Sequence, residues 1–485
     1  MVGMRLISAA LALLVFSAHA DIFNNKIILV GDKGAALGGA FTGLADDATA
    51  TYYNPAGMTQ IKNVKLNVSA QVVQYQMQSI QIAPSTFIPY NSFNFSPSIT
   101  SFSQRLGRWA YGFSIVTPVN DLFRGEQSFE SAYRDTDTTG RCYDPEWTPC
   151  YTKLNLGYYE VTKMNLVGPS LALKVSDRIS LGATLYGIYY TNLEKTSFGG
   201  WDANFVNRDP KDMSRFHEDE VLRTVNQTGF GMVGTVGILI SLPNGISLGV
   251  NASPGGTVWV DRSEEQRYID FNNDSLVQGP DDFSDTRAKW IYTLGGEESH
   301  KEISAPRLSI GVAMTPWDRL MLTGQIDYLL GSLYSYTGFT PIGNPDSRSD
   351  FETLEAAEIQ YTVGKRPVIN LSGGLNLRMT KAYSLAMGGY TDFSQGPYED
   401  RPAGWNRRID YYGATLSLGM DKQYTESRFG LGASWGDAAI SHFQWRQNAG
   451  GKPAIATNKD GSIRRLRKRF DAFNFGLFLS STLKI

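Results

Sequence analysis

The pattern of apolar and polar positions alternates with a period of two from about residue 62 to the end of the chain. In the stretch ISLGATLY (179–186) the odd positions are apolar and the even ones mostly polar or small; 320–328 and 369–378 repeat the pattern. Period two with one apolar face predicts β-strands. The other face carries Asn, Gln, Asp and Arg, which suits a wet or plugged interior and is typical of transmembrane barrel strands.

Fourteen segments follow this pattern. They are 62–82, 93–105, 107–118, 158–176, 178–196, 226–241, 244–260, 300–314, 317–334, 366–379, 381–395, 407–420, 427–443 and 468–485. Pro97 and Pro169 fall inside two of them, and each predicts a bulge or bend because proline removes a ladder donor.

The connections between these segments alternate in length. Short ones lie at 106–107, 177, 242–243, 315–316, 380 and 421–426; the others, at 83–92, 119–157, 197–225, 261–299, 335–365, 396–406 and 444–467, are mostly long and polar. Bacterial outer-membrane barrels have an even strand number, short periplasmic turns and longer outer loops. We therefore predict an all-β fold, a 14-stranded antiparallel transmembrane β-barrel over 61–485, with both of its ends on the periplasmic side.

The segment before the first strand is dense in glycine and alanine. It runs from Gly31 to Met58 and closes with Asn54-Pro55-Ala56. Small residues allow close backbone approach, and Pro55 stops a smooth helix. We predict a helical plug, or hatch, over 21–60; the alternative is a flexible linker.

The first twenty residues have the three parts of a secretory signal peptide (1–20). Arg5 supplies the positive charge, Ala9–Phe16 the apolar run, and Ala18-His19-Ala20 the cleavage pattern. A membrane anchor is the alternative, but the apolar run is too short to span a bilayer. Aromatic residues make up 12% of the 485 residues and glycine numbers 49, which favours a Gly- and aromatic-rich β-protein. The net charge of −2 says nothing for or against nucleic acid.

Two cysteines, Cys142 and Cys150, lie in one polar segment. In an oxidising compartment they are expected to form a disulfide, with free thiols as the alternative. We expect no metal site there, because two cysteines without a nearby histidine leave a ligand set incomplete. The mature chain has three histidines and no Gly-x-Ser-x-Gly motif, so we expect no enzyme and no cofactor.

Two charged groups have competing interpretations. Asp46 and Asp47 resemble an acid–base pair, but in the predicted plug they are expected to bond the backbone. The run Arg464, Arg465, Arg467, Lys468 and Arg469 lies at the start of the last strand. Its partner there would be lipopolysaccharide phosphate, which arginine binds bidentately, or only solvent; nucleic acid is implausible at this place.

The signal peptide, the sequence Leu44-Ala-Asp-Asp-Ala followed by Asn54-Pro55-Ala56, and the fourteen strands together resemble the FadL-like family. These are outer-membrane transporters of long-chain fatty acids and aromatic hydrocarbons. The resemblance implies a hatch formed by Asp46, Asp47, Asn54, Pro55 and Ala56.

The resemblance also implies that the first mature residues reach the ligand pocket, which makes Phe23 the ligand-binding candidate. It implies lateral exit beside a kinked third strand, about 107–118 here, where Gly112 is the weak point. Outer loops at 197–225 and 261–299 would capture substrate.

From these observations we expect passive uptake of hydrophobic small molecules across the bacterial outer membrane by a monomer. Fatty acid, alkane and aromatic substrates stay open. A water-filled porin and a surface adhesin barrel are the alternatives.

Overall fold

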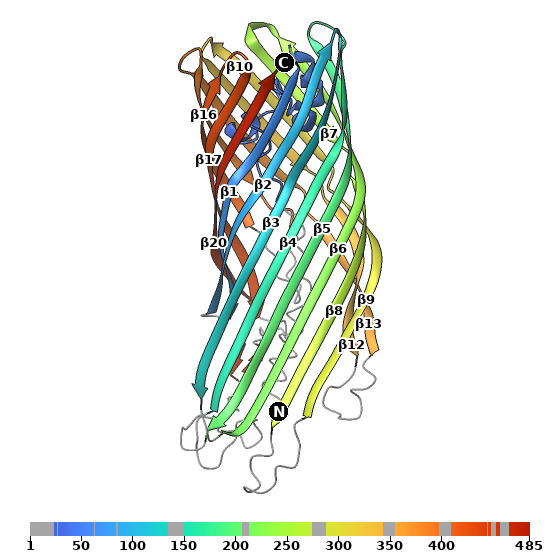
Figure 1. Ribbon diagram of the computed structural model, residues 1–485, viewed down its shortest axis with the longest axis vertical. Coiled ribbons are helices and arrows are strands. Elements are labelled where there is room, and N and C mark those ends of the chain that lie inside the picture. The colour runs from blue at the N-terminus through green and yellow to red at the C-terminus, as the bar shows by residue number, and fades with distance from the viewer. Residues whose placement is uncertain are drawn as a thin grey trace.

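The computed structural model describes residues 24–26, 28–62, 64–83, 86–133, 150–205, 213–273, 288–342, 355–396, 409–443, 445–447, 453–455 and 465–485. Its main feature is a closed antiparallel β-barrel (Figure 1). The barrel closes because β1 pairs with β2 on one side and with the last strand, β20, on the other. Within these residues no helix has the length and apolar character needed to cross a membrane.

The barrel has fourteen strands, as the alternation predicts: ten run without interruption and four are each bent into two pieces. The uninterrupted strands are β1 (Lys65–Ala83), β2 (Thr86–Leu106), β3 (Trp109–Tyr133), β4 (Cys150–Lys174), β5 (Ile179–Phe205), β6 (Met213–Leu242), β15 (Tyr383–Asp392), β16 (Ile409–Asp421), β17 (Thr425–Phe443) and β20 (Arg465–Lys484). The bent strands are β7 (Ile246–Ser253) with β8 (Thr257–Asn273), β9 (Ala288–Ile303) with β10 (Arg307–Trp317), β11 (Leu320–Leu329) with β12 (Ser332–Ile342), and β13 (Glu355–Lys365) with β14 (Val368–Arg378). A separate small hairpin joins β18 (Trp445–Gln447) and β19 (Pro453–Ile455).

Each of the four bends contains proline or glycine. They lie at 254–256, 304–306, 330–331 and 366–367. Proline cannot donate to a ladder and can interrupt a strand, as at these bends, although β4 continues through Pro169 in register with β3. On the side of the bends away from the short turns, β12 pairs with β13 in a sheet of their own, and β9 is the edge of the main sheet over the ranges described.

The predicted long connections are wrong over much of their length. Strand β3 continues to Tyr133 and β4 begins at Cys150, so most of the predicted loop 119–157 is strand. The loops at 197–225 and 261–299 shorten in the same way. A strand that carries polar side chains on both faces loses the alternation by which strands are recognised. The short connections are confirmed, as is the bulge at Pro97, where the β1–β2 register shifts.

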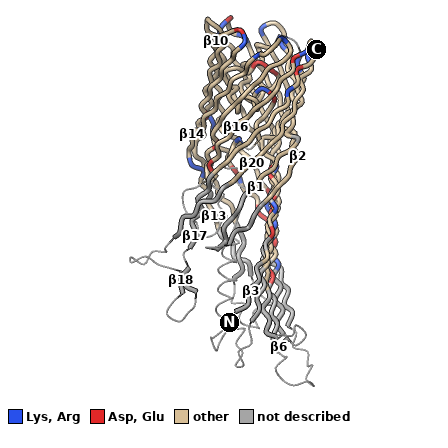
Figure 2. Tube along the Cα trace, turned by 90° about the vertical axis from the view of Figure 1, so that its left-hand side faces the viewer, with Lys and Arg blue, Asp and Glu red and all other residues tan. Residues whose placement is uncertain are grey.

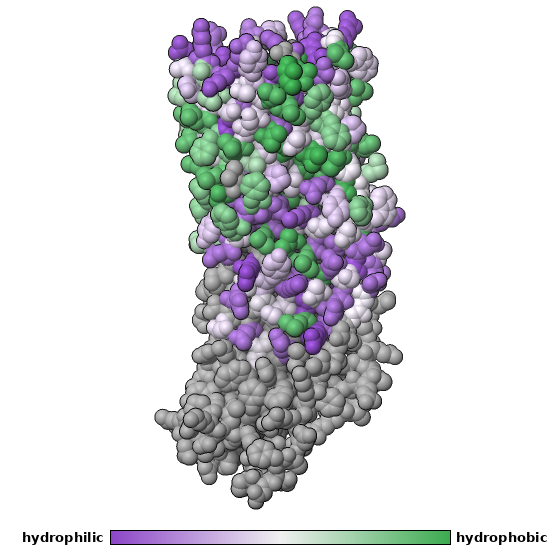
Figure 3. Space-filling model, in the orientation of Figure 1, coloured by the Kyte–Doolittle hydropathy of each residue, from purple (hydrophilic) through white to green (hydrophobic). Residues whose placement is uncertain are grey.

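The outer surface carries an apolar belt below a polar rim at the short-turn end (Figure 3). Charged residues gather at that rim, near the C-terminus (Figure 2). Exposed aromatic residues mark both edges of the belt: Trp109, Trp317, Tyr383 and Tyr424 beside the short turns, and Tyr189, Phe230, Trp259, Tyr412 and Trp435 further along the strands. Positions 424 and 435 are eleven residues apart, the length with which a tilted strand spans a bilayer core.

The N-terminal segment, residues 24–61, lies in the lumen against the inner face of the strands (Figure 1). It contains α2 (Lys33–Ala36), α3 (Ala50–Tyr53) and the 3₁₀ helix η1 (Pro55–Gln60). The side chain of Asp32 caps α2, and Pro55 occupies the first turn of η1, where its missing amide hydrogen costs nothing. Phe41, Ala45 and Met58 are fully buried between segment and wall.

Glycines on the inner face make room for this segment. A Cβ on Gly249 would lie 2.0 Å from the carbonyl oxygen of Thr42, and one on Gly311 would lie 2.6 Å from the amide nitrogen of Gly43. Neither distance is possible, so only glycine admits the segment there. The same close approach occurs at Gly182, Gly237, Gly374 and Gly388.

We predict that Gly249→Ala displaces the N-terminal segment without opening the barrel. The added methyl group meets backbone rather than a movable side chain, and overpacking of this kind costs about 1–3 kcal/mol. Limited proteolysis should cleave within 28–61 at least several-fold faster, while heat-modifiable gel mobility stays unchanged. Gly432→Ala is the matched control, because its Cβ would have no neighbour closer than 3.7 Å. Equal cleavage of the two variants would contradict the assignment.

Candidate functional site

A cavity of about 190 Å³ lies in the lumen beside the N-terminal segment. One side of it is apolar and is built from the inward-facing residues of four strands. These are Met164 and Leu166 of β4, Tyr186, Ile188 and Tyr190 of β5, Val233 of β6 and Val258 of β8. Most of them are buried, so the wall offers a dry surface to an apolar ligand.

The opposite side of the cavity is polar. Asn24 and Asn25 of the N-terminal segment line it, together with Arg307, Lys365 and Gln395. The Arg307 guanidinium carbon lies 5.8 Å from the centre of the Tyr52 ring, in a cation–π arrangement. A ligand there would meet an aromatic wall and a small number of polar groups, which is the usual composition of a binding pocket.

A buried ionic network lies in the lumen on the β5, β6 and β8 strands, beyond Tyr190 along β5. Arg223 bonds Glu194 at 3.0 Å and Glu264 at 2.7 Å, and Glu264 also bonds Arg262. All four side chains are at most 3% exposed. Breaking a buried pair leaves an uncompensated charge and costs about 3–5 kcal/mol, so this part of the lumen resists an apolar solute.

The start of the N-terminal segment is fixed to the far wall of the barrel. The amide nitrogens of Asn25 and Lys26 donate to the Asp392 carboxylate, both at 2.9 Å. The Lys26 ammonium forms an ion pair with Asp327 at 2.9 Å and donates to Ser372 at 2.6 Å. These bonds hold residues 24–26 at the edge of the cavity. No local sequence pattern marks Asp392 or Asp327 as a partner of this segment.

Asn54, Pro55 and Ala56 form a turn that is bonded both to the segment and to the wall. The Asn54 Oδ1 accepts from the Ala56 amide at 3.2 Å, and its Nδ2 donates to the carbonyls of Thr42 and of Ile238 in β6, each at 3.0 Å. The turn presses on Gly182 and Gly237. Asn54 therefore anchors the segment to β6.

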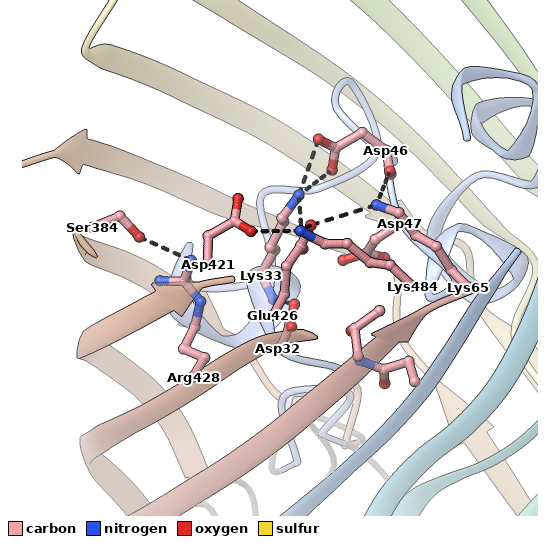
Figure 4. Close-up of polar contacts among 12 residues, drawn as sticks. Asp32, Lys33, Asp46, Asp47, Lys65, Ser384, Asp421, Glu426, Arg428 and Lys484 are labelled. Carbon is pink, nitrogen blue, oxygen red and sulfur yellow. Dashed lines mark hydrogen bonds and ion pairs between the residues drawn. The ribbon is translucent and has the colours of Figure 1, made fainter. Parts of the chain in front are cut away.

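An ion cluster joins the N-terminal segment to the first and last barrel strands at the short-turn end (Figure 4). Lys33 bonds Asp46 at 3.0 Å, and Glu426 of β17 receives Lys484 of β20 at 3.0 Å. Lys33 and Lys65 of β1 lie 3.9 Å from Glu426. Burial lowers the pKa of Lys33, but Asp46 and Glu426 outweigh it and hold that pKa above its usual value. Because these groups keep some solvent exposure, each ion pair contributes only about 0–1 kcal/mol to stability.

Asp47, the neighbour of Asp46, is completely buried. Its Oδ1 accepts from the Thr49 amide at 2.8 Å and from the Thr49 hydroxyl at 2.6 Å, whereas Oδ2 has no hydrogen-bond partner among the described atoms. Burial, and then the neighbouring Asp32 carboxylate, raise the pKa of Asp47 to about 7. The two aspartates thus differ: Asp46 bonds a lysine and Asp47 bonds the backbone.

The barrel wall has a ladder break between β2 and β3, next to the cavity. Backbone pairing of the two strands ends at Ile99 and Val116, and the β3–β4 register shifts at Thr117–Pro118. Beyond this point side chains bridge the strands over the described residues: Asn94 Nδ2 donates to the Asn120 carbonyl at 2.9 Å, and Asn120 Nδ2 to the Phe95 carbonyl at 3.2 Å. Pro118 itself lines the cavity. We call this break the β2–β3 seam.

At Gly112, by contrast, the sheet is continuous. It pairs with Ser103 of β2 and Ser170 of β4. A Cβ on Gly112 would lie 2.8 Å from the Phe102 carbonyl oxygen of β2, and 3.0 Å from the Met58 sulfur of η1. The ladder break lies in the predicted strand but six residues further on, at Pro118, where proline in a strand is the signal. A lateral exit there stays a prediction.

Several predicted residues lie outside the described part of the structure. The signal peptide (1–20), Phe23, Cys142 and Arg464 are among them, so ligand contact by Phe23 and the disulfide stay predictions. Cys150 begins β4, and Arg465, Arg467, Lys468 and Arg469 begin β20, but their side chains are not described. The lipopolysaccharide contact therefore stays a prediction as well.

Comparison with solved structures identifies the fold. A Pseudomonas aeruginosa FadL homologue superposes with a TM-score of 0.54 at 15% identity, covering 94% of this chain and 98% of the other. The Ralstonia pickettii toluene transporter TbuX superposes with a TM-score of 0.55 at 11% identity, covering 94% of this chain and 98% of the other. The CymD monoaromatic hydrocarbon channel superposes with a TM-score of 0.51 at 11% identity, covering 95% of this chain and 98% of the other. No protein-family model and no curated protein matches the sequence. The chain has the FadL-like transporter fold.

We predict that docking of the N-terminal segment weakens as the pH rises from about 4 to about 7. The docked state holds a proton on Asp47 up to about pH 7, whereas the undocked carboxyl loses it near its ordinary value of 3.8. Docking therefore takes up a proton in this range and is favoured at lower pH. Hydrogen exchange of 42–53, corrected for the intrinsic pH dependence, should show protection falling as the pH rises.

Asp47→Asn should remove this pH dependence, because the amide does not titrate. Asp177→Asn, at an exposed short turn, should retain it. If protection of 42–53 falls with pH in the same way in the parent and in Asp47→Asn, another group causes the pH dependence of docking.

Proposed function

We propose that this chain carries small hydrophobic molecules passively across the bacterial outer membrane. In this proposal the cavity holds the molecule, the N-terminal segment acts as a hatch, and the β2–β3 seam is the lateral exit. The observation that carries it is a cavity with a dry aromatic and aliphatic wall that reaches Pro118 at the seam. The FadL-like fold and the apolar belt support it. No step requires an enzyme or a cofactor.

The size of the cavity favours single-ring or short-chain hydrocarbons over long-chain fatty acids. An engineered cavity of about 150 Å³ lined by apolar side chains binds benzene. Pockets for larger, drug-sized ligands measure roughly 300–1,000 Å³. At about 190 Å³ this cavity is close to the first class. The lining holds Glu302 as well as Arg307 and Lys365, so the argument against a fatty acid rests on size and not on charge.

Movement of the hatch would release the molecule toward the seam. The polar contacts between segment and wall include the Lys33–Glu426 and Lys26–Asp327 ion pairs and the hydrogen bond from Asn54 to Ile238. Within the segment, one carboxylate oxygen of the buried Asp47 has no partner among the described atoms, and undocking would release the cost of burying it. We place the short turns, the hatch and both termini on the periplasmic side and the elongated strands outside, and we expect a monomer.

The exit can be tested by crosslinking the seam. In a background with Cys142 and Cys150 changed to Ser, Asn94→Cys/Asn120→Cys should form a disulfide across it. Oxidation should lower uptake of labelled toluene at least tenfold, and reductant should restore it, because the exit is held shut. The purified oxidised protein should still bind toluene. Unchanged uptake by the fully crosslinked protein would move the exit elsewhere.

The same assay separates the alternatives. A porin would admit sugars in liposome swelling, whereas the transporter should not, because the N-terminal segment occupies the lumen. An adhesin would lose cell binding on deletion of its outer loops and would show no toluene uptake. Labelled oleate tests the size argument: we expect its uptake to be less than a tenth of that of toluene.

We predict that Asn54→Ala, Pro55→Ala and Phe23→Ala reduce toluene uptake while the barrel assembles. Asn54→Ala removes three hydrogen bonds that position the hatch, each contributing about 0.5–1.5 kcal/mol. Heat-modifiable mobility and surface amount are the controls. Normal uptake by all three variants would mean that the segment has only a structural role and does not gate transport. Loss of barrel assembly would mean that these residues act in folding.

A further inference from the structure

We propose that the β12–β13 hairpin is a hinged flap over a second opening of the wall, between β9 and β12, through which a small apolar molecule enters the cavity. This inference rests on the proposed function and concerns entry, whereas the β2–β3 seam concerns exit. Four independent features of the structure carry it.

The first feature is the pairing of the strands. Over the described residues β12 pairs with β13 alone, and β9 pairs with β8 but has no ladder partner on its other side. Between the bends and the short turns the same polypeptide is tightly paired, since β10 pairs with β7 and with β11. The backbone sheet is therefore open between β9 and β12, where the hairpin lies beside β9 (Figure 1).

The second feature is the way the hairpin is attached. Among the described residues its backbone continues into the barrel at Leu330–Gly331 and at Arg366–Pro367, which lie next to each other. Gln395, 2% exposed, donates from Nε2 to the carbonyls of Leu330 at 3.0 Å and Arg366 at 3.2 Å. This side chain fixes the two attachment points together and leaves the hairpin beyond them free to turn as a unit.

The third feature is what holds the flap against β9. The contacts are made by side chains: Arg262 donates to the Thr337 carbonyl at 3.1 Å, and the Thr337 amide donates to the Glu298 carboxylate. The ring of His300 stacks on Tyr334, with centroids 6.4 Å apart and planes 7° apart. Such contacts can be broken without unravelling a ladder.

The fourth feature is the position of the cavity. Its lining includes Ile303, Ser304 and Ala305 at the β9–β10 bend, Leu329 at the end of β11, and Lys365 at the end of β13. The cavity therefore reaches the foot of the flap. The axial way in from the outer end passes the Arg223–Glu194–Glu264–Arg262 network, which is buried and charged. An apolar molecule that enters at the flap does not cross this network.

The test locks the flap in the full-length protein with Cys142 and Cys150 changed to Ser. Glu298→Cys/Thr337→Cys places two thiols across the opening, because the Thr337 amide bonds the Glu298 side chain. Oxidation should lower toluene uptake at least tenfold and also abolish loading of the cavity in purified protein, and reductant should restore both. The loss of loading distinguishes this lock from the lock at the seam.

The matched control crosslinks the hairpin to itself. Ser335 and Thr362 are exposed partners on β12 and β13, 3.0 Å apart at their hydroxyls. Oxidised Ser335→Cys/Thr362→Cys should transport within twofold of its reduced form, because the flap still moves as a unit. If Glu298→Cys/Thr337→Cys does not assemble, His300→Cys/Tyr334→Cys joined by a short bifunctional thiol reagent makes the same lock.

Three results are distinguishable. Loss of loading and uptake on locking, with the control unaffected, supports the flap. A fully crosslinked lock that loads and transports like its reduced form overturns the flap and leaves the proposed function intact. A parent protein that neither binds nor transports toluene or oleate overturns the proposed function and the entrance with it.

Discussion

The arrangement of the lumen depends on direct contact between the backbone of the N-terminal segment and the backbone of the barrel wall. Gly249 and Gly311 admit Thr42 and Gly43 at distances that no Cβ would permit. The segment also buries the large side chains of Leu37, Phe41 and Met58. Hydrogen bonds and ion pairs from Asn54, Lys26 and Lys33 to the wall fix its position. Interiors are close-packed, so the fit leaves the segment little choice of position while it is docked.

The strands of the barrel were largely predictable from the sequence because the apolar belt imposes a period of two. The count of fourteen and the short connections follow from it. Where strands leave the belt both faces carry polar residues, as in β6 from Met213 to Arg223, and the alternation disappears. The four bends were missed although Pro254, Pro306 and Pro367 mark three of them in the sequence. Alternation continues through the bends at 254–256, 304–306 and 330–331 and conceals them, whereas the bend at 366–367 coincides with the start of a predicted segment.

The site was less predictable, because it depends on register and on contacts distant in sequence. The inward face of β5 follows from alternation, so Tyr186, Ile188 and Tyr190 could have been assigned to the lumen. Their proximity to Arg307 and Asn24 could not have been predicted, since the stagger of the strands decides which residues lie at the same height in the barrel. The pairing of Lys26 with Asp327 spans 301 positions and has no local signal. The family resemblance directed attention to the third strand, and only the ladder located the interruption at Pro118.

The ion cluster around Glu426 has a consequence for the order of assembly. Lys65 and Lys484 belong to the first and last strands, which become neighbours only when the cylinder closes, and Lys33 comes from the chain inside it. While these two strands are apart, a chain segment can enter the interior from the side; once they are paired, it no longer can by this route. The cluster is complete only when the N-terminal segment is inside and β1 has paired with β20. It thus makes correct filling of the interior a part of the last joining step in biogenesis.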